Sequence, residues 1–325
     1  MKSIRFMDAA AVEQALTMKH AIEWMEQVYR LYSRGEAEVF PIIAHEFDES
    51  LRSMDIKSGH LDGADIAGLK MLIRVRDNPE KRGLPNLTGL VLVSNSKTGQ
   101  PIGLLDGLSI TNKRTGAAGG LAARVFARRD SSCAVIVGAG YQGRMQAMGL
   151  IEALPNLAAV TYAALHRQNA ERLALEMGVA YPAVEFTSCD VAELPGQLAS
   201  CDVLVTCTNS RQPIVLREWI RPGTHINAVG ADMEGKAELE PSLVASARLF
   251  ADSLKQVVRL GECQHAYGQG LIGLGDITEI GDVLEGKKPG RTSEEEITIF
   301  DTTGMAIQDL IVGAKLLENS EPLSS

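Results

Sequence analysis

Residues 134–143 read Ala-Val-Ile-Val-Gly-Ala-Gly-Tyr-Gln-Gly, an apolar run that leads into a Gly-x-Gly-x-x-Gly motif. The run predicts a strand, and residues 144–153 continue with a helical pattern. In this context Gly138 permits a tight turn, Gly140 lets the backbone approach a pyrophosphate, and Gly143 allows close packing of helix and strand. A second strand expected at residues 159–163 follows the helix. The stretch therefore predicts a dinucleotide site, with a helix N-terminus facing the phosphates, rather than an ordinary glycine turn.

Strands and helices alternate after this motif. Helices are expected near residues 169–177 and 191–198, and strands at residues 202–207, 225–229, 248–251 and 297–300. Parallel strands need crossover connections, so the alternation predicts an α/β fold with a Rossmann-type doubly wound parallel sheet. A helix of small residues over 114–128 leads into this domain. A final helix over 304–318 is expected to pack back on the N-terminal part.

The N-terminal third has a different pattern. Asp8 and Thr17 are suited to cap helices, and apolar residues at helical spacing run from Ile22 to Tyr32. Short apolar runs at residues 68–73 and 89–93 are separated by turn-forming residues, which is typical of a sheet. We therefore expect a sheet-rich α+β domain of residues 1–113 with 305–325, and a nucleotide-binding domain of residues 114–304.

Composition limits the classes of partner. The chain has 325 residues, a net charge of -9 and no dense run of Lys or Arg, which argues against a nucleic-acid surface. No apolar run reaches the ~18 residues of a membrane span, and the first residues lack the apolar region of a signal peptide, so we expect a cytoplasmic protein. Five cysteines without Cys-x-x-Cys spacing and six scattered histidines predict neither a disulfide framework nor a metal site.

In doubly wound sheets, ligands bind beyond the carboxyl ends of the strands. Three polar segments follow predicted strands there: 206–210, 230–232 and 301–304. Helix caps or loops explain the two hydroxyl-rich segments equally well. The candidate cofactor-binding residues are Gly138, Gly140, Tyr141, Gln142, Gly143, His166, Arg167, Thr206, Thr208, Asn209, Val229 and Gly230.

The choice between NAD and NADP is read at the end of the second strand, where an acidic residue would bind the ribose hydroxyls of NAD. Residues 163–168 contain no Asp or Glu. Arg167, together with His166, is suited to face a 2′-phosphate, which favours NADP(H) over NAD(H). The alternative is that Arg167 is a solvated residue at a helix start.

A set of cations marks the N-terminal domain. Lys70 lies inside an apolar strand, where a charge is unfavourable unless it has a partner or a ligand. Arg114 begins a small-residue segment and presents a planar fork suited to a carboxylate. Arg52 is a third candidate. A structural salt bridge is the alternative, equally supported for Arg52 and less so for Lys70 and Arg114.

Several motifs occur in order along nearly the whole chain. They are Gly68-Leu69-Lys70, Gly83-Leu84-Pro85, Thr98-Gly99-Gln100-Pro101, Arg114-Thr115-Gly116-Ala117, the glycine motif, Gly230-Ala231-Asp232 followed by Lys236 and Glu238-Leu239, and Asp301-Thr302-Thr303-Gly304. Through them the sequence resembles the ornithine cyclodeaminase/mu-crystallin family. The combination is specific for the family and does not select one member.

The resemblance implies a homodimer whose N-terminal domains join their sheets, a Rossmann domain carrying NAD(H) or NADP(H), and a small amino-acid or imino-acid substrate held between domains. By matching positions, Lys70 and Arg114, with Arg52, hold the substrate carboxylate. Asp232 matches the catalytic acid/base, with Lys70 beside it as a catalytic residue. Asn86 matches a residue near substrate and nicotinamide.

The implied chemistry moves a hydride between the nicotinamide and the α-carbon of an amino acid. Water capture or reduction of the imine gives an amino-acid dehydrogenase or a ketimine reductase, whereas attack by a side-chain amine gives ornithine cyclodeaminase. Cyclising members have a glutamate before the Gly-x-Lys strand, and this chain has Asp55 there, so we favour net redox chemistry. A nucleotide-binding protein without turnover is the alternative of another class, disfavoured by the joint presence of Asp232, Lys70 and Arg114.

Overall fold

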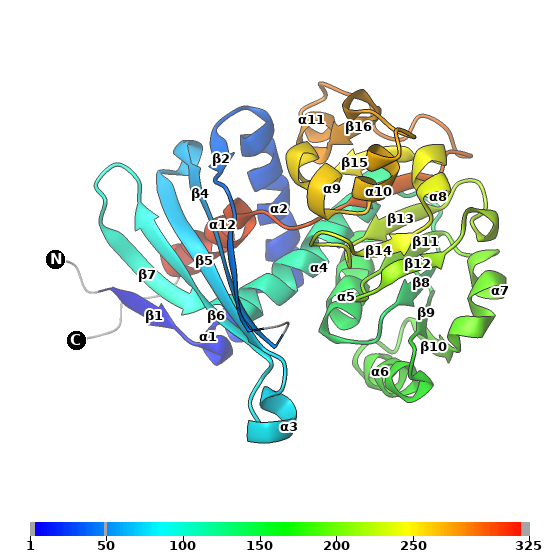
Figure 1. Ribbon diagram of the computed structural model, residues 1–325, viewed down its shortest axis with the longest axis horizontal. Helices are drawn as coiled ribbons and strands as arrows, with labels where there is room; N and C mark the ends of the chain where they lie inside the picture. Colours follow the sequence, from blue (N-terminus) through cyan, green and yellow to red (C-terminus); the bar gives the residue numbers. More distant parts are fainter. Residues whose placement is uncertain (1–3, 49–50, 320–325) are drawn as a thin grey trace. The chain divides into compact units, whose positions relative to one another are not determined.

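The computed structural model describes residues 4–48 and 51–319, which divide into two compact units. The first unit contains the described residues up to Arg114 together with those from Met305 onward, and the second spans Thr115–Gly304 (Figure 1). Arg114, which we expected to open the second domain, belongs to the first unit. Among the described residues, no helix combines the length and apolar character needed to cross a membrane.

The second unit contains a parallel sheet with the strand order β10-β9-β8-β11-β13-β17-β15-β16. Its strands are β8 (Cys133–Val137), β9 (Ala159–Ala163), β10 (Glu185–Cys189), β11 (Val203–Thr206), β13 (His225–Ala228), β15 (Arg248–Ala251), β16 (Ile277–Glu279) and β17 (Thr298–Asp301). The order reverses at β8, since β9 follows on one side and β11 on the other. The predicted doubly wound sheet is confirmed.

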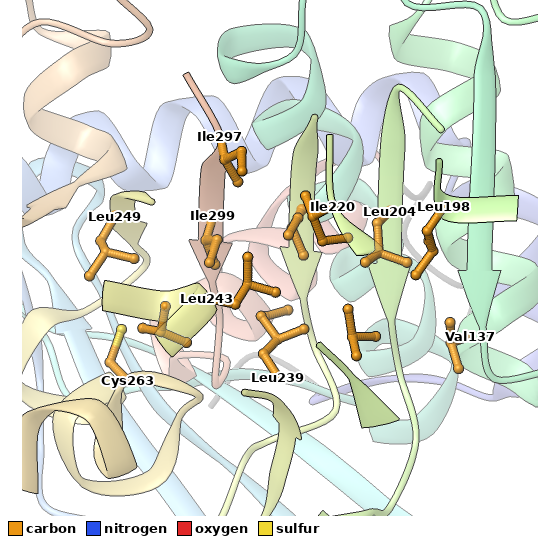
Figure 2. Close-up of a cluster of buried hydrophobic side chains, with 14 of the residues drawn as sticks. Val137, Leu198, Leu204, Ile220, Leu239, Leu243, Leu249, Cys263, Ile297 and Ile299 are labelled. Atoms are coloured by element: carbon orange, nitrogen blue, oxygen red, sulfur yellow. The ribbon is translucent and has the colours of Figure 1, made fainter. Parts of the chain in front are cut away.

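Helices cover both faces of this sheet. They are α4 (Gly107–Phe126), which enters from the first unit, α5 (Tyr141–Ala153), α6 (Arg167–Ala180), α7 (Leu194–Leu198), α8 (Pro241–Ser246), α9 (Leu254–Leu260), α10 (Cys263–Gly268) and α11 (Ile280–Leu284). Alternate residues of β8 enter different cores: Val137 packs with Leu204 and Leu243, and the neighbouring Ile136 packs with the opposite cluster. Figure 2 shows the first of these cores, which includes Leu239.

The first unit contains a mostly antiparallel sheet with the order β1-β7-β6-β5-β4-β2, in which β3 also pairs with β4. Its strands are β1 (Arg5–Met7), β2 (Ala37–Val39), β3 (Ile43–Asp48), β4 (Arg52–Leu61), β5 (Ile66–Val75), β6 (Leu87–Asn95) and β7 (Pro101–Asp106). Its helices are α1 (Ala9–Ala15), α2 (Met18–Ser33), α3 (Asn78–Arg82) and α12 (Ala306–Asn319). The predicted sheet-rich α+β domain is confirmed, as is the return of the last helix to it.

Helix α12 packs directly on β4, β5 and β6. Gly68 makes this possible, because a Cβ there would clash with the carbonyl of Leu92 and lie 2.8 Å from Leu310 Cδ2. Both predicted N-caps are confirmed: Asp8 accepts the N–H of Ala11 at 2.9 Å, and Thr17 accepts that of His20 at 3.1 Å. Helices α1 and α2 thus begin where their capping side chains predict.

The structure corrects the start of the small-residue helix. We expected it to begin at Arg114, but α4 begins at Gly107, where the Asp106 carboxylate accepts the N–H of Ser109 at 2.7 Å. The sequence pattern also gave no sign of a separate two-stranded parallel sheet, β12 (Arg211–Val215) with β14 (Ala237–Leu239). Strands this short carry too few residues to show a period of two.

Candidate functional site

The glycine turn between β8 and α5 has the geometry that the motif predicts. Gly138 has φ of +123°, and a Cβ there would lie 2.8 Å from the carbonyl oxygen of Cys207. A Cβ at Gly143 would clash with the carbonyl of Gly138, which lets α5 start directly against β8. At Gly140 a Cβ would meet no atom within 4 Å, so packing of the chain itself does not require glycine there. Close approach of an external phosphate group does require it.

The end of β9 opens into a surface hollow. It has a volume of about 570 Å³ and is lined by Leu165, His166, Arg167, Gln168 and Asn169, none of them acidic. Arg167 is half-exposed and its Nε lies 2.9 Å from Glu171 Oε1, one helical turn further along α6. Arg167 therefore lines the hollow after β9, where we expected a ribose site, and it also forms an ion pair at the start of α6.

Other predicted cofactor residues lie at the ends of β8, β11 and β13. Tyr141 begins α5 and is exposed, and Gln142 follows it. Thr206 is the buried last residue of β11, and Val229 is buried just after β13. All these positions are at the carboxyl edge of the parallel sheet, where ligands bind in this class of fold.

The carboxylate of Asp232 is held in place by Lys236. This carboxylate, 43% exposed, accepts a hydrogen bond from Lys236 Nζ at 2.6 Å. The same ammonium donates to the carbonyl of Gly230 at 3.0 Å and to Asn209 Oδ1 at 3.2 Å. Lys236 therefore joins the segment after β11 to the segment after β13, and it fixes the half-exposed carboxylate at the edge of the sheet.

Glu238 is a fully buried carboxylate at the same place. Its Oε1 accepts the N–H of Thr208 at 2.6 Å, and its Oε2 accepts the N–H of Gly230 at 3.0 Å. Burial raises the pKa of Glu238, and hydrogen bonds from Thr208, Thr206 and Gly230 oppose that rise. We quoted Lys236 and Glu238 as part of a motif, but their contacts depend on turn geometry that the spacing does not give.

The first unit contains a buried charge cluster in which Lys70 and Arg114 share one carboxylate, that of Asp309 on α12. Lys70 Nζ lies 2.8 Å from Asp309 Oδ2, and Arg114 Nε lies 3.1 Å from Asp309 Oδ1. Lys70 also donates to Thr111 Oγ1 at 3.1 Å, and Arg114 to Gln308 Oε1 at 3.0 Å. The structure thus brings Lys70 and Arg114 together, and each has a protein partner.

The balance of charge in this cluster is positive. Two cations face one carboxylate, and Lys57 lies directly opposite Lys70 in the β4–β5 ladder. Burial lowers the pKa of Lys70, with Arg114 and Lys57 adding to that effect and Asp309 opposing it. Burial raises the pKa of Asp309, but the charges of Arg114 and Lys70 outweigh burial and bring it below its ordinary value. The surplus positive charge is suited to an anionic ligand such as a carboxylate.

Arg52 and Asn86 do not join this cluster. Side chains alternate between the faces of a strand, and the register of β4 places Arg52 on the face opposite to that of Lys57 and Lys70. Arg52 forms an ion pair with Asp48, with 2.7 Å between Nε and Oδ2. Asn86 is exposed before β6, and its carbonyl accepts the N–H of Val75 at 2.8 Å.

Asp309 is the site residue that we missed in the sequence. It lies in the apolar helix α12 and is fully buried. The signal that identified Lys70, a charge within an apolar segment, was present here too. Within residues 4–48 and 51–319, His, Cys, Asp and Glu side chains form no group of three or more suited to hold a metal ion, and the five cysteines are unpaired.

Comparison with known proteins extends over nearly the whole chain. A family model described as "Ornithine cyclodeaminase/mu-crystallin family" matches residues 3–321. The alanine dehydrogenase of Archaeoglobus fulgidus is 40% identical over 312 residues, which cover 95% of this chain and 92% of that protein. An archaeal alanine dehydrogenase dimer with bound NAD has 36% identity and a TM-score of 0.89, covering 97% of this chain and 95% of the other. The Δ1-pyrroline-2-carboxylate reductase of Thermococcus litoralis, solved with NADH and L-proline, has 30% identity and a TM-score of 0.90, covering 96% of each chain.

Proposed function

Because the chain belongs to the ornithine cyclodeaminase/mu-crystallin family, we propose that it is an NAD(P)-dependent oxidoreductase acting at the α-carbon of a small L-amino acid or its imine. The activity is of the amino-acid dehydrogenase or ketimine reductase type. The observation that carries this proposal is the surplus positive charge of the Lys70–Asp309–Arg114 cluster, in a chain that also has a dinucleotide-type glycine turn.

The residues at the carboxyl edge of the parallel sheet fit a nicotinamide dinucleotide. The turn at Gly138, Gly140 and Gly143 would hold the pyrophosphate at the start of α5. Thr208 and Asn209 would lie near the nicotinamide riboside, on the other side of β8 from β9. When bound, the dinucleotide supplies the acceptor or donor of a hydride.

Lys70 and Arg114 would bind and orient the substrate carboxylate. Their shared partner Asp309 accepts a hydrogen bond from Arg114 and forms an ion pair with Lys70, and an Arg or Lys side chain has further N–H groups to donate. Asp232 would manage the proton on the substrate nitrogen or on water, since it is half-exposed and held in place by Lys236. Arg52 and Asn86 lie away from the cluster in the first unit, so we assign neither a primary role in carboxylate binding.

Cyclodeamination is a second candidate, and the position of Asp55 favours it. The register of β4 places Asp55 two residues before Lys57, on the face that also carries Lys70. A carboxylate on this face is suited to the distal ammonium of a diamino acid such as ornithine. Its shorter side chain, relative to the glutamate of cyclising relatives, keeps this candidate second.

One assay separates these candidates. In the oxidative direction, the protein is incubated with a panel of L-amino acids and either NAD+ or NADP+. In the reductive direction, it is incubated with NADH or NADPH and one of two kinds of substrate, cyclic imines or 2-oxo acids with ammonia. Stoichiometric change in reduced cofactor identifies a dehydrogenase or reductase, and ammonia release without such a change identifies cyclodeamination. Tight nucleotide binding with no turnover on any substrate would contradict both activities and indicate a nucleotide-binding protein.

We expect a preference for NADP(H) that depends on Arg167. No acidic side chain lines the hollow after β9, and the guanidinium of Arg167 is the cation placed there. Replacing Arg167 with Ala is expected to raise KM for NADPH about tenfold, because a charge-assisted hydrogen bond to phosphate is lost, while KM for NADH changes little. An unchanged ratio of the two KM values would rule out this role for Arg167.

We also propose that the protein is a homodimer joined through the sheets of the first unit, as the resemblance implies. The sheet face opposite α12 carries many apolar side chains, which by register include Phe6, Met54, Ile56, Leu69, Met71, Leu90, Leu92 and Leu104. Phe6 is 59% exposed, although exposed apolar surface of this extent is unfavourable in an isolated unit.

Replacing Leu90 with Glu is expected to convert the dimer into a monomer, because the change puts a charge in the middle of this apolar face. Light scattering coupled to size-exclusion chromatography measures the mass. The matched control is Leu175→Glu, since Leu175 is 72% exposed on α6 in the other unit, and this variant should remain dimeric. A Leu90→Glu dimer of unchanged stability would place the interface elsewhere.

A further inference from the structure

We propose that Glu238 is a positioning residue that fixes the two turns on which the nicotinamide half of the cofactor rests. The inference deepens the proposed function and depends on it. Glu238 itself is fully buried, so its side chain would not contact the cofactor directly. It acts through the backbone of Thr208 and Gly230.

Lys236, just before β14, and Glu238, within it, present two opposite charges to the same pair of turns. Lys236 and Glu238 are two residues apart, a spacing that places side chains on one side of an extended segment. Lys236 donates to oxygen atoms of Asn209, Gly230 and Asp232, whereas Glu238 accepts N–H groups of Thr208 and Gly230. Acceptors and donors of both turns are therefore satisfied from one short segment, residues 236–238.

The strand that carries Glu238 is itself held from behind. The Glu262 carboxylate accepts the N–H of Glu238 at 2.5 Å and that of Leu239 at 2.7 Å. The side chain of Leu239 packs in the core shown in Figure 2. These contacts fix the backbone of Glu238, and its side chain therefore joins the two turns to the core that contains Leu239.

The sheet order assigns these turns to the nicotinamide side. A dinucleotide crosses the sheet where the strand order reverses, which is at β8. The hollow after β9 lies on one side of β8, and the ends of β11 and β13 lie on the other side. If the adenosine half is bound at β9, the nicotinamide riboside reaches Thr208 and Gly230.

Glu238→Gln tests this with a readout other than activity. The N–H groups of Thr208 and Gly230 bind different oxygens of Glu238, and Gln has one acceptor oxygen, so one turn loses its contact with this side chain. If that turn is the one after β13, the N–H of Gly230 keeps only the carbonyl of Thr206, at 3.1 Å. By isothermal titration, Kd should rise about tenfold for NADPH or NADH, whichever the wild type binds more tightly. The Kd for ADP, which lacks the nicotinamide riboside, should stay unchanged.

Two further variants complete the experiment. Gly230→Ala displaces the same contact from the other side, because a Cβ at Gly230 would clash with Glu238 Oε2 and lie 2.5 Å from the carbonyl of Thr208. It should reproduce the selective loss, and it keeps the test valid if Glu238→Gln fails to fold. The matched control is Glu279→Gln, since Glu279 accepts the N–H of Leu254 at 2.9 Å beyond another strand, β16. Both affinities should be unchanged in this control.

The outcomes separate the inference from the proposed function. Equal weakening of dinucleotide and ADP in both test variants would show a general structural role and overturn the inference, as would unchanged affinity in both. A wild type that binds neither nucleotide would overturn the proposed function and the inference together. Selective loss of the dinucleotide supports both.

Discussion

Replacing Asp309 with Asn is expected to lower the free energy of unfolding by about 3–5 kcal/mol, because it leaves two buried cations without their shared carboxylate. Lys70 can respond by losing its proton, but Arg114 remains charged at any relevant pH. The new amide also brings an NH2 group close to one of these donors. Urea unfolding followed by circular dichroism measures the change.

The control for this prediction is Glu13→Gln. Glu13 binds Lys113, the residue next to Arg114 on α4, with 2.9 Å between Nζ and Oε2, but its side chain is 51% exposed. Lys113 is buried, but it also donates to the carbonyls of Glu13 and Leu16, so it keeps partners in this variant, and the loss should be about 1 kcal/mol. If Asp309→Asn were no more destabilising than Glu13→Gln, the buried cluster would not depend on its shared carboxylate.

Replacing Asp232 with Asn is expected to reduce kcat by about 100-fold or more, because an amide cannot transfer the proton that the carboxylate handles. The amide oxygen can still accept the hydrogen bond from Lys236, so the side chain should keep its position. The KM for the amino acid, which we expect to depend on Lys70 and Arg114, should change little. Steady-state kinetics in both reaction directions provide the measurement.

Asp276→Asn is the matched control for the loss of turnover. Asp276 ends a 3₁₀ helix of the second unit (Leu274–Asp276), where its carboxylate accepts the N–H of Gly273 at 2.7 Å. Its replacement should leave kcat unchanged. Turnover of Asp232→Asn close to that of the wild type would mean that another group handles the proton.

The sequence predicted the elements of the fold better than the contacts between them. The glycine turn and the alternation of β8, α5 and β9 depend on residues close in sequence, so spacing alone predicted them. Strand register depends on pairing between segments. The sequence suggested that Arg52 and Lys70 belong to one cationic set. Arg52 and Lys57 are an odd number of residues apart on β4, so their side chains lie on opposite faces, and Lys70 shares the face of Lys57.

Partners from distant segments were the main omission. Lys70 was identified because its charge is unfavourable in an apolar strand, yet that argument gives no position for the compensating group. The partner lies near the end of the chain, on α12, and only the tertiary fold brings Asp309 to Lys70. The contacts of Glu238 were not predicted for a related reason, since its carboxylate oxygens accept backbone N–H groups, which every residue but proline has.

The return of α12 to the first unit has a consequence for the order of events during translation. The ribosome releases residues 115–304 before it releases Asp309, so the middle of the chain can fold while the earlier unit still waits for its last helix. Until α12 has been synthesised, Lys70 and Arg114 lack the carboxylate of Asp309, with which they are buried in the folded unit. Of the two units, the one that precedes in the chain therefore cannot complete its buried charge cluster until α12 has been synthesised.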